Sequence, residues 1–293
     1  MTQIKFGTDG WRAIIAQEFT VENVARVAEA TGNWLLKNEK SPSVVLGHDC
    51  RFAGELFCDV IAKILCSKGI KVLLAKGFVS TPMISYGAVT LKADLGIIIT
   101  ASHNPPEYNG FKLKGSFGGP LQPSLVAEIE AIIPDKCTID YEKITLDEYS
   151  KNGLLEIVDL ETMYCDQVEK SFDLNAIKNS GLTLAYDAMY GAGQNVIRKL
   201  LPDAALLHCD YNPGFNGVAP EPILKNLLEF SELIKKNDKI LCGLATDGDA
   251  DRIGFFDSKG RFVDSHHLIL LLMQYLTKYK GLSGKIVKSF SVS

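Results

Sequence analysis

Short apolar runs alternate with segments of helical periodicity along most of the chain, and this alternation is the strongest constraint on its fold. In the first half, the runs are SVVLGHD, IKVLLA and LGIIIT. Residues 20–38 and 52–68 carry apolar side chains at helical spacing, with Thr20 as the expected N-cap of the first helix and Gly69 placed to end the second. Continuous apolar strands joined by helices are typical of sheets covered on both faces. We therefore expect an α/β fold of repeated three-layer α/β/α domains with mixed, largely parallel sheets.

The alternation pauses at residues 134–155, which are polar and contain proline and glycine, and it then resumes. The later strand candidates are LTLAYD, AALLHCD and KILCGLAT. We expect a first domain at 1–155 and a second at 156–262. Residues 263–293 open a further helix and a further strand, which predicts the start of a third, incomplete domain.

Bulk properties exclude several classes of protein. The 293-residue chain has a net charge of −4 and no basic stripe with interleaved aromatics, so no nucleic-acid partner is expected. It has no secretory leader pattern and no apolar run of the roughly 18 residues that span a bilayer, so no membrane association is expected. The seven cysteines are scattered without a CxxC pair, which is typical of reduced, buried thiols in a cytoplasmic protein. The oligomeric state cannot be deduced from the sequence.

The stretch TASHNPPEYNGFK directly follows the apolar run LGIIIT and places Ser102 beside His103, with Lys112 ten residues after the serine. A proline-rich turn is the ordinary explanation, since serine, asparagine and proline are common turn formers. In open α/β sheets, however, ligands bind beyond the carboxyl ends of the strands, where Ser102 and His103 are expected to lie. Lys112 could reach the same crevice.

The stretch LATDGDADRIGFF contains three alternating carboxylates, Asp247, Asp249 and Asp251, after a predicted strand. Carboxylates this close repel one another unless a metal ion or a cationic side chain balances them. A solvated acidic turn is the simple alternative, but the flanking runs look buried. Oxygen-only ligands favour a hard cation, with Mg²⁺ as the default when a phosphate completes its coordination.

Two further motifs carry weaker signals. In FGTDGWR, the glycines allow a close backbone approach and Arg12 offers a planar, permanently charged fork suited to phosphate, although a glycine turn with a surface arginine is the more common explanation. In GHDCR, we expect Asp49 and Arg51 to be structural supports.

In their order along the chain, these motifs resemble one family. GTDGWR, HDCR, TASHNP with YNGFK, PEP and DGDADR are similar to the motifs of the α-D-phosphohexomutases, which include phosphoglucomutase, phosphomannomutase and phosphoglucosamine mutase. The resemblance covers essentially the whole chain. The family has four domains, and its later sugar-binding and phosphate-binding loops have no counterpart before Ser293. We therefore expect an N-terminal portion of a mutase that is poorly active by itself.

The resemblance also implies roles for individual residues. Ser102 matches the serine that carries a phosphoryl group. The implied ligands of Mg²⁺ are an oxygen of that phosphoserine and the carboxylates of Asp247, Asp249 and Asp251.

The remaining matched residues are cationic or titratable. Arg252 matches an arginine beside the phosphoserine. Arg12, His103 and Lys112 match residues that contact phosphate or assist proton transfer, and the resemblance leaves open which of His103 and Lys112 is the acid or the base.

The implied activity is the interconversion of hexose 1-phosphate and hexose 6-phosphate through a phosphoserine enzyme and a sugar 1,6-bisphosphate, which also acts as activator. Glucose and mannose phosphates are the expected substrates, with glucosamine phosphate behind them. Two alternatives remain: a magnesium-dependent hexose-phosphate phosphatase that uses the same serine, and a non-catalytic binding protein that retains the fold.

Overall fold

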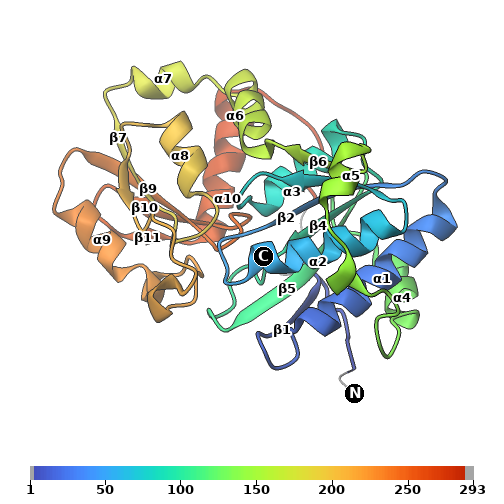
Figure 1. Ribbon diagram of the computed structural model, residues 1–293. Helices are drawn as coiled ribbons and strands as arrows, with labels where there is room; N and C mark the ends of the chain where they lie inside the picture. The colour runs from blue at the N-terminus through green and yellow to red at the C-terminus, as the bar shows by residue number, and fades with distance from the viewer. Residues whose placement is uncertain (1–2, 288–293) are drawn as a thin grey trace.

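The computed structural model describes residues 3–287, which form two α/β units side by side (Figure 1). The first unit contains β1 (Trp11–Ile14), α1 (Val21–Asn38), β2 (Ser43–His48), α2 (Gly54–Ser67), β3 (Lys71–Ala75), α3 (Thr81–Thr90), β4 (Leu95–Ile99), β5 (Tyr108–Gly115), α4 (Pro123–Ala131), η1 (Tyr141–Lys143), α5 (Asp147–Lys151) and β6 (Leu155–Val158). The expected helix signals are confirmed: Thr20 caps α1 by accepting a hydrogen bond from the Asn23 amide, and Gly69 follows the end of α2 with a positive φ.

The sheet of the first unit has the strand order β1-β5-β4-β2-β3-β6. Strands β4, β2, β3 and β6 are mutually parallel, whereas β5 runs antiparallel to both of its neighbours. Alternate side chains of β2 enter different cores, because successive residues of a strand face opposite sides of the sheet. Val44 and Leu46 pack on the side of α1, α2 and α4, whereas Val45 packs on the side of α3. The expected three-layer arrangement with a mixed sheet is therefore confirmed.

The first sheet differs from the expectation at three strands. β6 pairs in parallel with β3, so the expected boundary between residues 155 and 156 cuts a strand of the first sheet. β1 and β5 lie where only turns were expected. The β5 sequence YNGFKLKG lacks a continuous apolar run because two of its buried side chains, Lys112 and Lys114, are cationic.

The second unit contains α6 (Leu160–Ser171), α7 (Leu174–Lys178), β7 (Thr183–Asp187), α8 (Gln194–Leu200), β8 (Ala205–Leu207), η2 (Phe215–Gly217), η3 (Leu224–Asn226), α9 (Leu228–Lys235), β9 (Ile240–Thr246), β10 (Ile253–Asp257) and β11 (Phe262–Val263). Its sheet order is β11-β10-β9-β7-β8, parallel from β9 to β8 and antiparallel from β9 to β11. Phe230 of α9 and Phe256 of β10 meet edge to face in its core.

The helix expected after residue 263 is present as α10 (Ser265–Gln274), continued by the π-helical turn η4 (Tyr275–Tyr279). The strand expected beyond it extends into residues 288–293, which lie outside the described residues. Within residues 3–287, none of the helices combines the length and the apolar character needed to cross a membrane. All seven cysteines are unbridged, and six of them are buried, as expected.

The N-cap of α1 provides a test of the fold. Replacing Thr20 by alanine (Thr20→Ala) removes the acceptor for the Asn23 amide and is expected to lower the free energy of unfolding by about 1 kcal/mol. Urea unfolding followed by circular dichroism measures this change. The exposed Ser41 provides the matched control, because Ser41→Ala removes a hydroxyl outside any helix. Equal midpoints for the two variants would contradict the capping role.

Candidate active site

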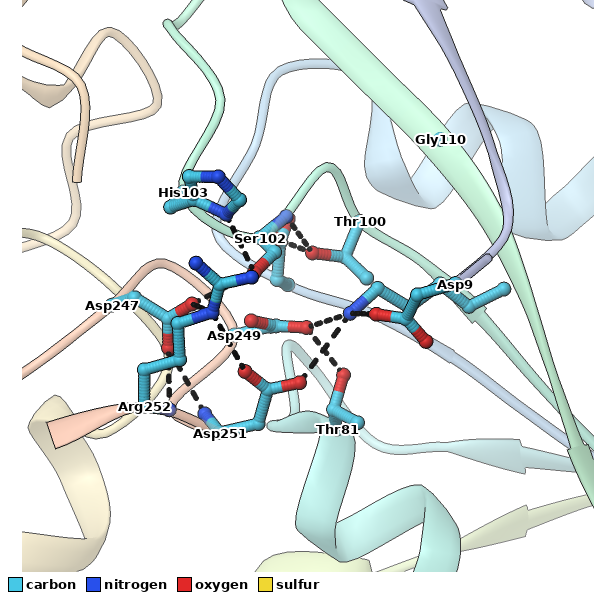
Figure 2. Close-up of polar contacts among 12 residues, drawn as sticks. Asp9, Thr81, Thr100, Ser102, His103, Gly110, Asp247, Asp249, Asp251 and Arg252 are labelled. Atoms are coloured by element: carbon cyan, nitrogen blue, oxygen red, sulfur yellow. Dashed lines mark hydrogen bonds and ion pairs between the residues drawn. The ribbon is translucent and has the colours of Figure 1, made fainter. Parts of the chain in front are cut away.

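Ser102 lies just beyond the carboxyl end of β4, at the centre of the boundary between the two units. Its side chain is buried, and its φ of +52° is a left-handed backbone conformation that non-glycine residues seldom adopt. Its hydroxyl Oγ donates a hydrogen bond of 2.8 Å to Oδ2 of Asp247 in the second unit (Figure 2). The serine thus faces the aspartate loop directly, as the sequence predicted.

Arg51 holds the serine loop in this strained conformation. Its guanidinium is buried and donates to four backbone carbonyls at 2.6–2.9 Å, those of Ser102, Asn104, Pro105 and Tyr108. The ring of Phe215, in the second unit, lies against the guanidinium, with 5.0 Å between its centroid and Cζ of Arg51. The planar fork of arginine suits this many acceptors, so Arg51 is the structural support that the sequence predicted.

Asp49 supports the same loop through Thr100. The Thr100 hydroxyl donates to Oδ2 of Asp49 at 2.5 Å and accepts from the amide of Ser102 at 2.9 Å. Burial raises the pKa of the Asp49 carboxyl to about 6 even though Arg51 and Thr100 act in the opposite direction. Asp49 is therefore a second structural support, and it fixes the Ser102 amide rather than the hydroxyl.

The three aspartates lie together in the loop between β9 and β10. One carboxylate oxygen from each of Asp247, Asp249 and Asp251 can be chosen so that all three lie within 4.8 Å of one another. Gly248 allows this loop to touch the serine loop: a Cβ at that position would lie 2.5 Å from the Ser102 carbonyl oxygen. A glycine is needed here for close approach, not for a turn.

Lys112 on β5 brings a positive charge into the aspartate cluster. Its side chain is wholly buried, and its Nζ lies 2.8 Å from Asp249, 2.8 Å from Asp9 and 3.4 Å from Asp251. Burial alone would lower the pKa of Lys112, but the three carboxylates outweigh it and raise the pKa. The three carboxylates therefore favour the charged form of Lys112 in this arrangement.

Because the Lys112 ammonium group contacts Asp249, the pKa values of the two buried carboxyls, Asp247 and Asp249, shift in opposite directions. Burial acts to raise the pKa of Asp249, but the contact with Lys112 outweighs it and the pKa is lowered. Asp247 has no cation at comparable distance, since Nε of Arg252 is 4.0 Å away, and burial with two neighbouring aspartates raises its pKa to about 8. A bound cation would favour the charged form of Asp247, because an opposite charge nearby lowers the pKa of a carboxyl.

An oxygen-binding cation fits this charge and these donors. Oδ1 of Asp249 is buried and has no hydrogen-bond partner within residues 3–287, which is costly for a carboxylate oxygen unless another group occupies its open side. With the neighbouring Asp247 and Asp251 oxygens it forms an oxygen-only donor set, the kind that Mg²⁺ prefers.

The other residues expected at the site lie around Ser102. Nδ1 of His103 is 3.4 Å from the Ser102 hydroxyl. Arg12, on β1, donates to Asn104 at 2.8 Å and lies 3.4 Å from Asp9. Arg252 is half exposed, and its guanidinium points toward Ser102 in Figure 2. The structure thus brings together all of the predicted site residues.

Three residues at the site were not singled out in the sequence: Asp9, Thr81 and Thr100. Asp9 belongs to the FGTDGWR motif, and its position two residues after Gly7 in a predicted turn could have marked it as a second acidic partner for Lys112. Thr81 begins α3 within the segment VSTPM, where a threonine before proline reads as an ordinary helix start. Thr100 ends the apolar run of β4 and gives no signal of its own.

Comparisons with known proteins identify the family to which the chain belongs. Residues 3–138 match the family model for α/β/α domain I of phosphoglucomutase/phosphomannomutase, and residues 162–260 match the model for domain II. A phosphoglucomutase/phosphomannomutase of Thermococcus kodakarensis is 33% identical over 98% of this chain. A phosphoglucosamine mutase of Caldicellulosiruptor bescii is 32% identical over 95% of it.

A solved structure of a similar protein also matches the fold of this chain. A crystal structure from Thermus thermophilus, provisionally named a phosphomannomutase, superposes on the whole chain with a TM-score of 0.90 at 35% identity. The chain belongs to the α-D-phosphohexomutase family, of which it contains domains I and II. It spans 62% of the Thermococcus protein, 61% of the Caldicellulosiruptor protein and 65% of the Thermus chain.

The grip of Arg51 on the serine loop can be tested by a conservative change. Arg51→Lys keeps the charge but cannot supply a planar fork to four carbonyls, so amide hydrogen exchange in residues 102–108 is expected to rise by roughly tenfold or more. Mass spectrometry of peptic peptides measures it. Arg198, which donates to one carbonyl at the surface, is the matched control as Arg198→Lys. Unchanged exchange in Arg51→Lys would show that the loop holds its shape without the fork.

Proposed function

We propose that this protein is a phosphohexomutase that interconverts hexose 1-phosphate and hexose 6-phosphate through a phosphorylated Ser102. The observation that carries the proposal is the placement of the Ser102 hydroxyl, buried, 2.8 Å from Asp247 and beside the Asp249–Lys112 pair. A reactive serine in a strained turn at the carboxyl end of a strand, facing a cation site, is suited to hold and release a phosphoryl group.

The proposed reaction has two balanced steps. In the first, the bond between phosphorus and Ser102 Oγ breaks, a bond forms to the free hydroxyl oxygen of the sugar phosphate, and the proton of that hydroxyl passes by way of a protein base to Ser102 Oγ. The resulting sugar 1,6-bisphosphate turns over. In the second step, Ser102 Oγ forms a bond to the other phosphorus, the bond between that phosphorus and the sugar oxygen breaks, and the serine proton passes to the sugar oxygen. His103 and Lys112 are the candidates for proton transfer at the reacting oxygens, and Nδ1 of His103 lies 3.4 Å from Ser102 Oγ.

Charge neutralisation is the main task of the remaining residues, because phosphoryl transfer depends chiefly on positioning and electrostatics. Lys112, Arg12 and Arg252 line the region around Ser102 and are proposed to hold the phosphate oxygens. We propose that Asp247, Asp249 and Asp251, with an oxygen of phosphorylated Ser102, hold Mg²⁺. When bound, Mg²⁺ would neutralise the charge that develops on the transferred phosphoryl group.

Both neutral and amino sugars are considered as substrates. Glucose and mannose phosphates are proposed first, and glucosamine phosphate is included because the similar proteins carry both kinds of name. We place the reaction in the cytoplasm, in keeping with seven unbridged cysteines. Activity is best measured on the longest polypeptide that contains this sequence, since the relatives it matches are longer.

Removal of the serine hydroxyl tests the mechanism. Ser102→Ala is expected to lower interconversion of hexose 1- and 6-phosphates by at least about 10³-fold, because it removes the hydroxyl that is proposed to carry the phosphoryl group. A coupled assay with Mg²⁺ and sugar 1,6-bisphosphate measures it, and intact-protein mass spectrometry is expected to show one added phosphate on the wild type only. Ser80→Ala, which removes the N-cap hydroxyl of α3, is the control. Full interconversion in Ser102→Ala would refute the proposal, and phosphate release without isomer formation would identify a phosphatase instead.

The cation site can be tested separately from turnover. Asp251→Asn keeps the size of the side chain but removes one negative charge from the cluster, so the dissociation constant for Mg²⁺ is expected to rise about tenfold or more. Isothermal titration calorimetry measures the constant after chelator treatment, which is also expected to abolish activity until Mg²⁺ is restored.

Asp257→Asn is the matched control, since Asp257 bonds to Lys259 and Arg261 in a turn outside the cluster. Equal Mg²⁺ affinity for Asp251→Asn and Asp257→Asn would show that the cation does not bind at the aspartate cluster.

A further inference from the structure

Thr81 belongs to the first unit but bonds to the aspartate loop of the second. It is the first residue of α3, and its side chain is 3% exposed. Its amide donates to the carbonyl oxygen of Asp249 at 2.9 Å, and its hydroxyl donates to Oδ2 of Asp249 at 2.6 Å. The two residues are 168 positions apart in the chain, so this double contact exists only when the units are in place.

The two oxygens of Asp249 are in different environments. Oδ2 accepts from both the Thr81 hydroxyl and Nζ of Lys112, whereas the buried Oδ1 has no hydrogen-bond partner in the part of the chain that the structure describes. Figure 2 shows the first oxygen on the side of Thr81 and the second on the side of Asp247 and Ser102. Because both donors bond to Oδ2, the other oxygen is left directed into the cluster.

We propose that Thr81 is a positioning residue that turns Oδ1 of Asp249 toward the cation. The proposal rests on the function proposed above. Lys112 supplies charge to the same oxygen, but its ammonium group is a point charge at the end of a flexible stem and does not define a direction. The β-branched Thr81 side chain is stiff and is anchored on a helix, so it does. Groups that orient a metal ligand in this way commonly change metal affinity by 10–100-fold when they are removed.

The two contacts of Thr81 can be separated by mutation. Thr81→Val has nearly the same shape and keeps the amide bond to the Asp249 carbonyl, so the loop stays attached to α3 while the carboxylate loses its orienting donor. Thr81→Ser keeps the hydroxyl. The difference between these variants therefore reports on the direction of the carboxylate and not on the contact between the units.

The experiment measures Mg²⁺ binding by isothermal titration calorimetry on the full chain, with Ser102 confirmed as unphosphorylated by mass spectrometry. The dissociation constant is expected to rise by about 10–100-fold in Thr81→Val and to stay within about threefold of wild type in Thr81→Ser. The control is Thr31→Val, because the buried Thr31 hydroxyl bonds only to a carbonyl within α1. A wild-type constant in Thr81→Val overturns the proposal.

A second variant covers the case in which Thr81→Val does not fold by circular dichroism. Thr81→Ala then replaces it, and binding by Thr81→Ala as tight as by Thr81→Ser overturns the role of Thr81. A failure of the underlying function looks different, because the wild type itself would then bind no Mg²⁺ or Asp251→Asn would bind it unchanged.

Discussion

The buried ion pair between Lys112 and Asp249 is the interaction on which the rest of the site depends. Each charge comes from a different unit, and both side chains are wholly buried, at 0% exposure. A buried charge without its partner destabilises a protein by several kcal/mol, so neither loop can adopt this conformation alone at low cost. The carboxylate of Asp9, which belongs to the first unit, contacts the same Lys112 ammonium group. The units are thus joined by charges that also belong to the aspartate cluster, so a change at the boundary between the units changes the cluster as well.

The serine loop is held differently, by hydrogen bonds to its backbone carbonyls and not by ion pairs between side chains. Around the left-handed Ser102, four backbone carbonyls of the loop accept hydrogen bonds from the single side chain of Arg51. Its stacking on Phe215 connects this support to the second unit. The left-handed Ser102 and a rigid support therefore come as a pair, and the strain is sustained by contacts that other residues make.

The sequence predicted those helices and strands whose apolar side chains recur at regular spacing or form a continuous run. The strand before Ser102 and the strand before Asp247 were found because both are continuous apolar runs, and the residues after them follow from the rule for parallel strand ends. β5 was missed because Lys112 replaces an apolar side chain at a buried position, and only its partners from elsewhere in the chain make that burial possible. Thr81 was missed for a related reason. Its hydroxyl donates a hydrogen bond to a residue 168 positions away, and the local sequence does not indicate such a partner.

Gly248 gives the boundary between the units a further property. Its missing side chain lets two loops from different units come into backbone contact, with no room for even one additional carbon atom. These contacts fix the distance between the two loops. Steric repulsion at Gly248 prevents a closer approach, and the ion pair between Lys112 and Asp249 opposes separation. A small hinge rotation of one unit would therefore change the gap between Ser102 and Asp247 before it disturbed either hydrophobic core. The hydrogen bond between Ser102 and Asp247 is therefore sensitive to the angle between the units.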